Sequence, residues 1–201
     1  MAHPVAEAAR NLAALDRWNV GYAEQPVPSQ PIENMLELKS KTQVPLAFNE
    51  GLWRVDRVME VIRRRAADYL VFGPYWVGTI ANFHRLSHEA AVEGLVVNKH
   101  THGELGIFAA ANQHVLLTLP RINGGNQQTA QMMQDDVVTT TIPIAAGPSW
   151  GIPEGPGLGI EVDEEKVAKY HTNYLALGQY LPYQLDRMGQ EDPGWRVPPK
   201  P

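Results

Sequence analysis

Two hydrophobic patterns alternate along most of the chain. Apolar residues recur at helical spacing within residues 5–15, 32–36, 55–62, 80–93 and 105–117, which predicts a helix in each segment. Short apolar runs with little alternation lie between them, at residues 22–24, 44–48, 68–72 and 95–97, and indicate strands covered on both faces. Residues 121–126 indicate a fifth short strand, and the pattern also allows a strand at residues 139–148.

The expected strands end at evenly spaced positions. Glu24, Glu50, Gly73, His100 and Asn126 mark these ends, and the intervals between them are 26, 23, 27 and 26 residues. A strand–helix unit of this length, repeated without interruption, predicts a parallel α/β architecture. Near-even repeats favour a barrel over a doubly wound sheet, although spacing alone leaves both open. In both architectures, functional groups gather at the carboxyl ends of the strands.

Polar side chains stand at most of these strand ends: Glu24, Asn49, Glu50, Lys99, His100 and Asn126. Carboxylate oxygens held on rigid strand ends suit Mg²⁺, which accepts little geometric error. The two glutamates therefore indicate a site for a hard cation. Taken singly, each is equally well explained as a solvated glutamate at a strand end.

The composition narrows the class of protein. The 201 residues, of which 44% are hydrophobic and 19% charged, suffice for one globular domain with a core. A net charge of -5 argues against nucleic acid or an anionic membrane as the main partner. The absence of cysteine excludes disulfides and thiolate–zinc sites. No apolar run approaches membrane-spanning length and no export signal is recognisable, so we expect a cytoplasmic enzyme.

Three stretches resemble the enolase superfamily, in the C-terminal barrel domain of its mandelate racemase and muconate lactonizing enzyme type. They are YAEQPVP at residues 22–28, PLAFNEG at residues 45–51 and IPEGPGLGIEVDEEKVAKY at residues 152–170, and the acid-sugar dehydratase branch matches best. The resemblance implies the later part, about strands four to eight, of a TIM-like (β/α) barrel with parallel strands and outer helices. Residues 1–170 would form this partial barrel domain, and residues 171–201 a tail that lies on the surface or is loose.

The resemblance also implies a reaction, in which a proton is removed from the carbon next to a carboxylate with the help of Mg²⁺. Glu24 and Glu50 match metal ligands of the family, and Asn49 stands where some branches place an aspartate ligand. His100 matches the general base. The substrate would be a small hydroxy-carboxylate of the acid-sugar class, and the enzyme a dehydratase, hence a lyase, or a racemase-like isomerase.

Three further polar residues enter the site by the same resemblance. Gln127 and Asn126 fall near the last-strand group that helps polarise the substrate carboxylate, so Gln127 is a catalytic candidate and Asn126 a substrate-binding one. Lys99 precedes the expected base and is the second substrate-binding candidate.

The chain departs from the family pattern in two places. The family's first metal ligand and its other base belong to strands that would precede this chain, and Gly73 stands where the base's aspartate partner is expected. An imidazole without its carboxylate loses orientation and some basicity. A non-catalytic, truncated half-barrel that serves only as a fold or assembly partner is therefore the alternative. With the strand of Glu24 as an open edge, we expect a homo-oligomer or a missing N-terminal segment, and weak Mg²⁺ binding.

Other interpretations of single residues stay open. His100 and His102 have the His-x-His spacing of amidohydrolase barrels, but there the motif ends the first strand. His84 and His88 are spaced to share zinc on one helix, although a crossover helix lies outside the barrel. Tryptophans that follow strand ends either wall a pocket or pack in the core: Trp53, Trp76 and Trp150.

Overall fold

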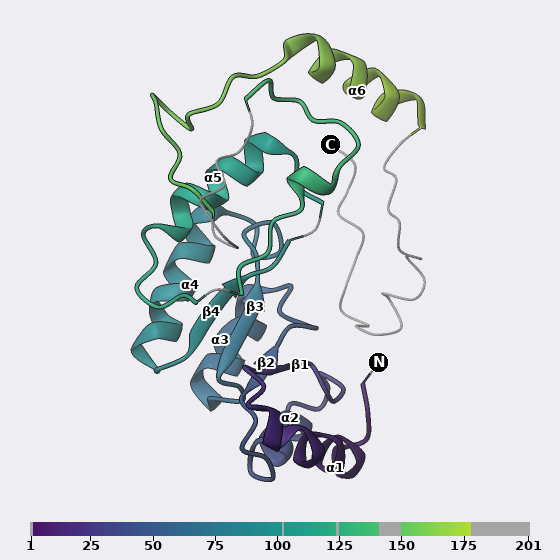
Figure 1. Cartoon of the computed structure of the whole chain (residues 1–201), viewed down its shortest axis with the longest axis vertical. Coiled ribbons are helices and arrows are strands. Elements are labelled where there is room, and N and C mark those ends of the chain that lie inside the picture. The colour runs from purple at the N-terminus through teal and green to yellow at the C-terminus, as the bar shows by residue number, and fades with distance from the viewer. Residues whose placement is uncertain (1, 102, 124, 141–149, 178–201) are drawn as a thin grey trace. The chain divides into compact units, whose positions relative to one another are not determined.

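The computed structural model describes residues 2–101, 103–123, 125–140 and 150–177. The chain forms two compact units, and the boundary between them lies between Val162 and Asp163. The first unit holds the strands and all but one of the described helices (Figure 1). Its elements are α1 (Val5–Leu15), η1 (Asp16–Trp18), β1 (Ala23–Glu24), α2 (Glu33–Lys39), β2 (Leu46–Phe48), α3 (Val55–Arg64), β3 (Tyr69–Phe72), α4 (Ile80–Val92), β4 (Val96–Lys99), α5 (Gly106–Leu116) and η2 (Ala130–Met132).

The four strands form one parallel sheet in the order β1-β2-β3-β4. Strand order therefore follows sequence order, and the parallel direction is the one that the repeat predicted. Each strand returns to the same end of the sheet through a helix, since parallel neighbours need a long crossover. The carboxyl ends of all four strands consequently lie along one edge, which confirms the predicted placement of Glu24, Glu50, Gly73 and His100 at a common end.

The fifth predicted strand, at residues 121–126, is not formed as a strand. Ile122 makes a single parallel bridge to Val97, and the segment then turns away from a regular ladder. Oδ1 of Asn126 and the backbone nitrogen of Gln127 instead bond to the backbone of Lys99 at the end of β4. Of the strand allowed at residues 139–148, residues 141–148 lie outside the described part of the chain. Val138, directly before it, bridges antiparallel to Val162.

One hydrophobic core joins the sheet to the helices α1 to α4. The strands direct alternate side chains to this core, because successive residues of a strand point to opposite faces. The helices meet them with residues three and four positions apart. Core residues from the strands are Leu46, Phe48, Leu70, Phe72 and Val97, and those from the helices include Leu12, Met35, Leu38, Val58, Ile62, Phe83 and Leu86.

The second unit is described through α6 (Glu164–Leu177) alone. Asp163 caps this helix, because its Oδ1 accepts a hydrogen bond from the backbone nitrogen of Lys166 at 3.0 Å. The helix extends past residue 170, so the expected domain limit falls inside it. The limits of the barrel domain stay a prediction, and the expected tail beyond residue 177 lies outside the described residues.

Among the helices that the structure describes, none combines the length and apolar character needed to cross a membrane.

Candidate active site

Glu24 and Glu50 lie beside the same cavity at the carboxyl edge of the sheet. The cavity measures about 350 Å³ and is lined by His3, Ala8, Asn11, Leu12, Glu24, Gln25, Pro26 and Glu50. Glu24 ends β1, and Glu50 follows β2 after one residue. Glu24 is exposed at the surface, but surrounding atoms shield its carboxylate from part of the solvent and raise its pKa. Two carboxylates that share a cavity are the kind of donors that a hard cation prefers.

Gln25 links the two backbone segments that carry these carboxylates, and its structural role was not predicted from the sequence. Its side chain is buried, and its Oε1 accepts hydrogen bonds from the backbone nitrogens of Asn49 at 2.9 Å and Glu50 at 3.1 Å. Its Nε2 donates to the carbonyl of Val27 at 2.9 Å. The residue adopts the left-handed backbone conformation, with φ 41°, which turns the side chain toward β2. Gln25 thereby fixes the backbone of Glu50 relative to that of Glu24.

Replacing Gln25 by methionine is expected to lower the free energy of unfolding by about 1–3 kcal/mol. The substitution keeps the shape of the side chain but leaves two backbone N–H groups without their acceptor in a buried place. Urea unfolding followed by circular dichroism measures the change. Gln43→Met is the matched control, because Gln43 is exposed. An equal loss of unfolding free energy in both variants would show that the hydrogen bonds of the Gln25 amide do not contribute to stability.

Asn49, the reserve metal ligand, is buried between β2 and β3. Its Nδ2 donates to the carbonyl of Val71 at 2.9 Å. The amide nitrogen is therefore engaged in joining the strands, and Oδ1 is the side-chain atom that could coordinate a cation. Its role as a ligand stays a prediction.

His100 lies at the end of β4 and is held on two sides. Its Nδ1 is 2.5 Å from the hydroxyl of Tyr75, and the indole of Trp76 stacks on its ring with centroids 4.8 Å apart and planes 25° apart. Its backbone nitrogen donates to the carbonyl of Phe72 at 3.0 Å, so the β3–β4 ladder continues through His100. Nδ1 is therefore the ring nitrogen that Tyr75 orients.

Lys99 lies on the face of β4 that packs against the helices, opposite to the face of Asn98. It is in register with Phe72, a core residue that faces the helices, whereas Asn98 is in register with Val71. Its ammonium is buried and forms an ion pair with Glu104, and it also donates to the carbonyl of Gln127 at 3.0 Å. Burial lowers the pKa of Lys99 to about 7. This position lends no support to a substrate-binding role for Lys99, which stays a prediction.

Asn126 and Gln127 are tied to β4 by hydrogen bonds. Oδ1 of Asn126 accepts from the backbone nitrogen of Lys99 at 2.8 Å, and the backbone nitrogen of Gln127 donates to the carbonyl of Lys99 at 2.9 Å. Oε1 of Gln127 accepts from the backbone nitrogen of Thr101 at 3.3 Å. Asn126 and Gln127 thus make hydrogen bonds with β4 of the kind that a neighbouring strand would make. Their predicted contacts with a substrate are not tested by this arrangement.

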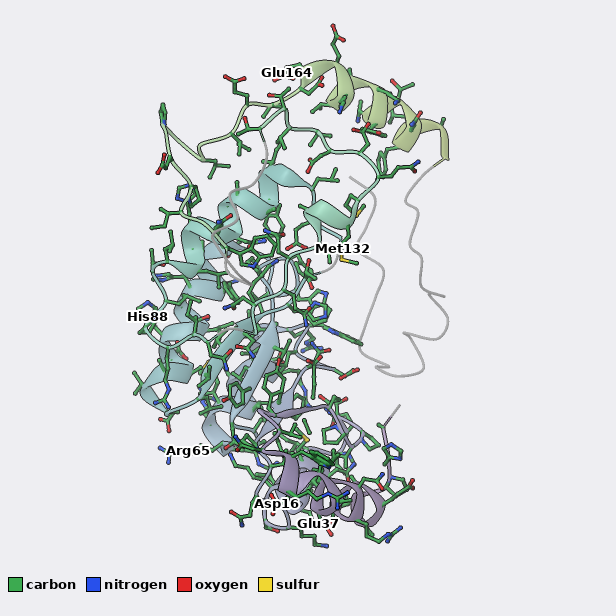
Figure 2. The ribbon with its side chains drawn as sticks, viewed as in Figure 1. Asp16, Glu37, Arg65, His88, Met132 and Glu164 are labelled. Carbon is green, nitrogen blue, oxygen red and sulfur yellow. The ribbon has the colours of Figure 1, made fainter. Side chains whose placement is uncertain are left out.

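One of the two alternative metal sites can be placed. The rings of His84 and His88 lie 4.4 Å apart on α4, and Figure 2 shows His88 on the outer side of that helix. His102 lies outside the described residues, so the His-x-His interpretation is not addressed. In the described parts of the chain, no three histidine, aspartate or glutamate side chains gather closely enough to hold a metal ion.

Comparison with known proteins identifies the family. The family profile described as "Enolase C-terminal domain-like" matches residues 1–166 of this chain. The chain belongs to the enolase superfamily. Its four parallel strands and outer helices are accordingly the later part of a TIM-like barrel.

Relatives in the enolase superfamily differ in activity. A protein of Streptomyces coelicolor named probable glucarate dehydratase is 28% identical over 182 residues, which are 90% of this chain and 42% of that protein. The crystal structure of an enolase from the same organism is similar with a TM-score of 0.75 at 30% identity, over 87% of this chain and 46% of that one. An enolase of Thermobispora bispora, complexed with magnesium and formate, is similar with a TM-score of 0.78 at 25% identity, over 96% and 45%. This chain spans less than half the length of these relatives.

The sequence did not predict the roles of two residues at the carboxyl edge of this enolase-superfamily chain. Gln25 stands between Glu24 and Pro26, and Tyr75 stands two residues after Gly73. Each acts through a hydrogen bond to a different strand end, so the residues that they hold are 24 or 25 positions away. The only local signal was their position directly after a strand end, where functional groups collect.

Proposed function

We propose that this chain contributes to a Mg²⁺-assisted enolase-superfamily site that removes the α-proton of a small hydroxy-carboxylate. The observation that carries the proposal is that Glu24 and Glu50 line one cavity at the carboxyl edge, the same edge at which β4 presents His100. An acid-sugar dehydratase is the favoured activity, and a racemase-like isomerase is the other. The cytoplasmic location and a homo-oligomeric state belong to the same proposal.

The donor set fits Mg²⁺ in part. Glu24 and Glu50 supply two carboxylates, and Oδ1 of Asn49 is the reserve donor, since its nitrogen is engaged with Val71. Further oxygen ligands would come from the substrate carboxylate and water, which Mg²⁺ commonly retains. When bound, Mg²⁺ would neutralise the negative charge that develops on the substrate carboxylate. Because burial raises the pKa of Glu24, protons compete with the cation for this carboxylate as the pH falls.

The residues of this chain would move the proton. Nε2 of His100 takes the α-proton, and the electron pair of the C–H bond passes into the substrate carboxylate as an enediolate. In a dehydratase, that pair then expels the hydroxyl of the neighbouring carbon, which leaves as water after taking the proton now held on Nε2 of His100. In a racemase, the carbon would take a proton on its other face from a second acid, which the family carries on an earlier barrel strand, while His100 releases its proton to solvent. Glu24 and Glu50 serve as oxygen ligands and take no part in the proton transfer, and Asn126 and Gln127 are candidates for polarising the carboxylate.

The non-catalytic alternative also has an observation in its favour. Position 73, where the family pairs the base with a carboxylate, is glycine, and no group of three metal-binding side chains exists in the part of the chain that the structure describes. A partial barrel of this kind would keep the fold without turnover.

Exchange of substrate protons with solvent deuterium separates the two functions. We expect the chain, incubated in deuterium oxide with a mixture of aldonic and aldaric acids, to incorporate deuterium at the α-carbon in proportion to added Mg²⁺. Glu50→Gln should lose this dependence, because an amide is a weaker ligand than a carboxylate. Glu37→Gln is the control, since Glu37 pairs with Lys41 on the exposed face of α2. No exchange with any acid at saturating Mg²⁺ would favour the non-catalytic partial barrel.

A further inference from the structure

A tyrosine side chain, Tyr75, lies directly against the imidazole of His100. Tyr75 follows β3 and sends its hydroxyl to Nδ1 of His100, 2.5 Å away. Its ring is fixed by edge contacts with Trp76, with centroids 5.3 Å apart, and with Phe108, with centroids 6.4 Å apart. Trp76 also covers one face of the imidazole. The imidazole is thus oriented through one ring edge and one ring face.

Gly73 provides the room for this arrangement. A Cβ atom at position 73 would lie 2.7 Å from Cε1 of Tyr75 and 3.1 Å from the backbone oxygen of His100. Any side chain at this position would therefore displace the tyrosine ring. The ring occupies the space into which a residue at the end of β3 would project, beside the end of β4.

We infer that Tyr75 is the positioning residue for His100 and that Gly73 is required for it to reach the imidazole. The inference deepens the proposed function and rests on it for the reactive role of His100; the pairing of the two side chains does not depend on turnover.

The chemistry of the hydroxyl defines what Tyr75 can do. A phenol oxygen that accepts a hydrogen bond from Nδ1–H selects the tautomer in which Nε2 carries no proton and is the basic nitrogen. When Nε2 gains the α-proton, Nδ1–H keeps donating to the same oxygen, so the ring is not released. Because the phenol is neutral, it stabilises the imidazolium less than a carboxylate would. Tyr75 therefore preserves the orientation of His100 while supplying less basicity.

Nitrogen-15 NMR of the imidazole tests the pairing directly. The signals of His100 in the 201-residue chain, assigned with His100→Asn, report which ring nitrogen carries the proton. We expect the Nδ1–H form to predominate, and Tyr75→Phe to lower its ratio to the Nε2–H form about two- to twelve-fold, as the loss of one net hydrogen bond predicts. Tyr69→Phe is the matched control, since Tyr69 lies on β3 and stacks on Tyr22 instead. Unchanged His100 signals in Tyr75→Phe would overturn the inference.

A rescue experiment separates positioning from packing. Tyr75→Ala opens the space beside Gly73, and Gly73→Asp in that background places a carboxylate where it can accept from Nδ1–H. We expect the aspartate to restore the Nδ1–H form, and Gly73→Ala in the same background to leave the ratio at its Tyr75→Ala value. Equal recovery with alanine would mean that the pocket only needs filling, which contradicts a positioning role.

Turnover provides a second readout. If the exchange reaction occurs, Tyr75→Phe should lower kcat several-fold with KM nearly unchanged, because the tyrosine acts through the imidazole and not on the substrate. A change in KM alone would contradict the inference. If no exchange occurs but the tautomer ratio shifts as expected, the proposed function fails and the pairing stands.

Discussion

Replacing Lys99 by methionine is expected to cost about 3–5 kcal/mol of the free energy of unfolding, because it leaves a buried carboxylate without its counter-charge. The side chains of Lys99 and Glu104 are exposed by only 1% and 3%. Glu104 would keep its hydrogen bond with the hydroxyl of Thr101, which cannot neutralise its charge. The carbonyl of Gln127 would lose a donor in addition.

Urea unfolding at pH 6, below the pKa of Lys99 of about 7, measures this effect with the lysine charged. Lys41→Met is the matched control, because the pair of Lys41 and Glu37 is about half exposed and is expected to contribute less than about 1 kcal/mol. Removing both members, in Lys99→Met with Glu104→Leu, should recover part of the loss, since the unpaired charge disappears. A loss in Lys99→Met no larger than in Lys41→Met would show that the buried pair is not a major contact.

The fold was largely predictable because hydrophobic spacing and crossover length determine it. The alternation of apolar runs and helical periods gave four strands whose order and parallel direction the structure confirms. The possible fifth strand is present among the described residues as one bridge, between Ile122 and Val97, since Asn126 and Gln127 hold β4 through side-chain and single backbone contacts. Hydrophobic pattern cannot reveal such a substitution, because the residues that make it are polar.

Lys99 shows where the sequence stops being informative about the site. It was placed with His100 because the two are adjacent, but adjacent residues of a strand point to opposite faces. β4 continues through Lys99, so the lysine shares the face of Phe72, where it pairs with Glu104. A shift of one residue in the strand end would reverse this result. Hydrophobic patterns do not define strand ends to that accuracy.

Gln25 and Tyr75 lie beyond local reasoning for another reason. Their roles depend on which atoms two different strand ends bring together, and that follows from register and side-chain rotamer. Gly73 was interpreted as the loss of a partner for His100. The structure adds that the same glycine admits Tyr75, so the absence of a side chain there has a structural use.

Replacing His100 by asparagine is expected to lower the rate of α-deuterium exchange by about 10²–10⁴-fold, the usual contribution of a positioned general base. Asparagine can take up hydrogen bonds but cannot accept a proton near neutral pH. Mg²⁺ affinity should stay nearly unchanged, because His100 is not among the proposed ligands. His84→Asn, on the outer helix α4, should change neither quantity.

Measuring exchange and Mg²⁺ affinity together assigns the role, since the two proposed groups of residues should separate. Glu24→Gln is expected to weaken Mg²⁺ binding by about 100-fold or more, because loss of a residue that only hydrogen-bonds a metal ligand already costs about 10- to 100-fold. Exchange should be lost as a consequence. His100→Asn should lose exchange at any Mg²⁺ concentration. If His100→Asn instead lost Mg²⁺ binding and exchange to the same degree, His100 would have a structural role at the carboxyl edge. A general base that does not contact the cation would not change the affinity for Mg²⁺.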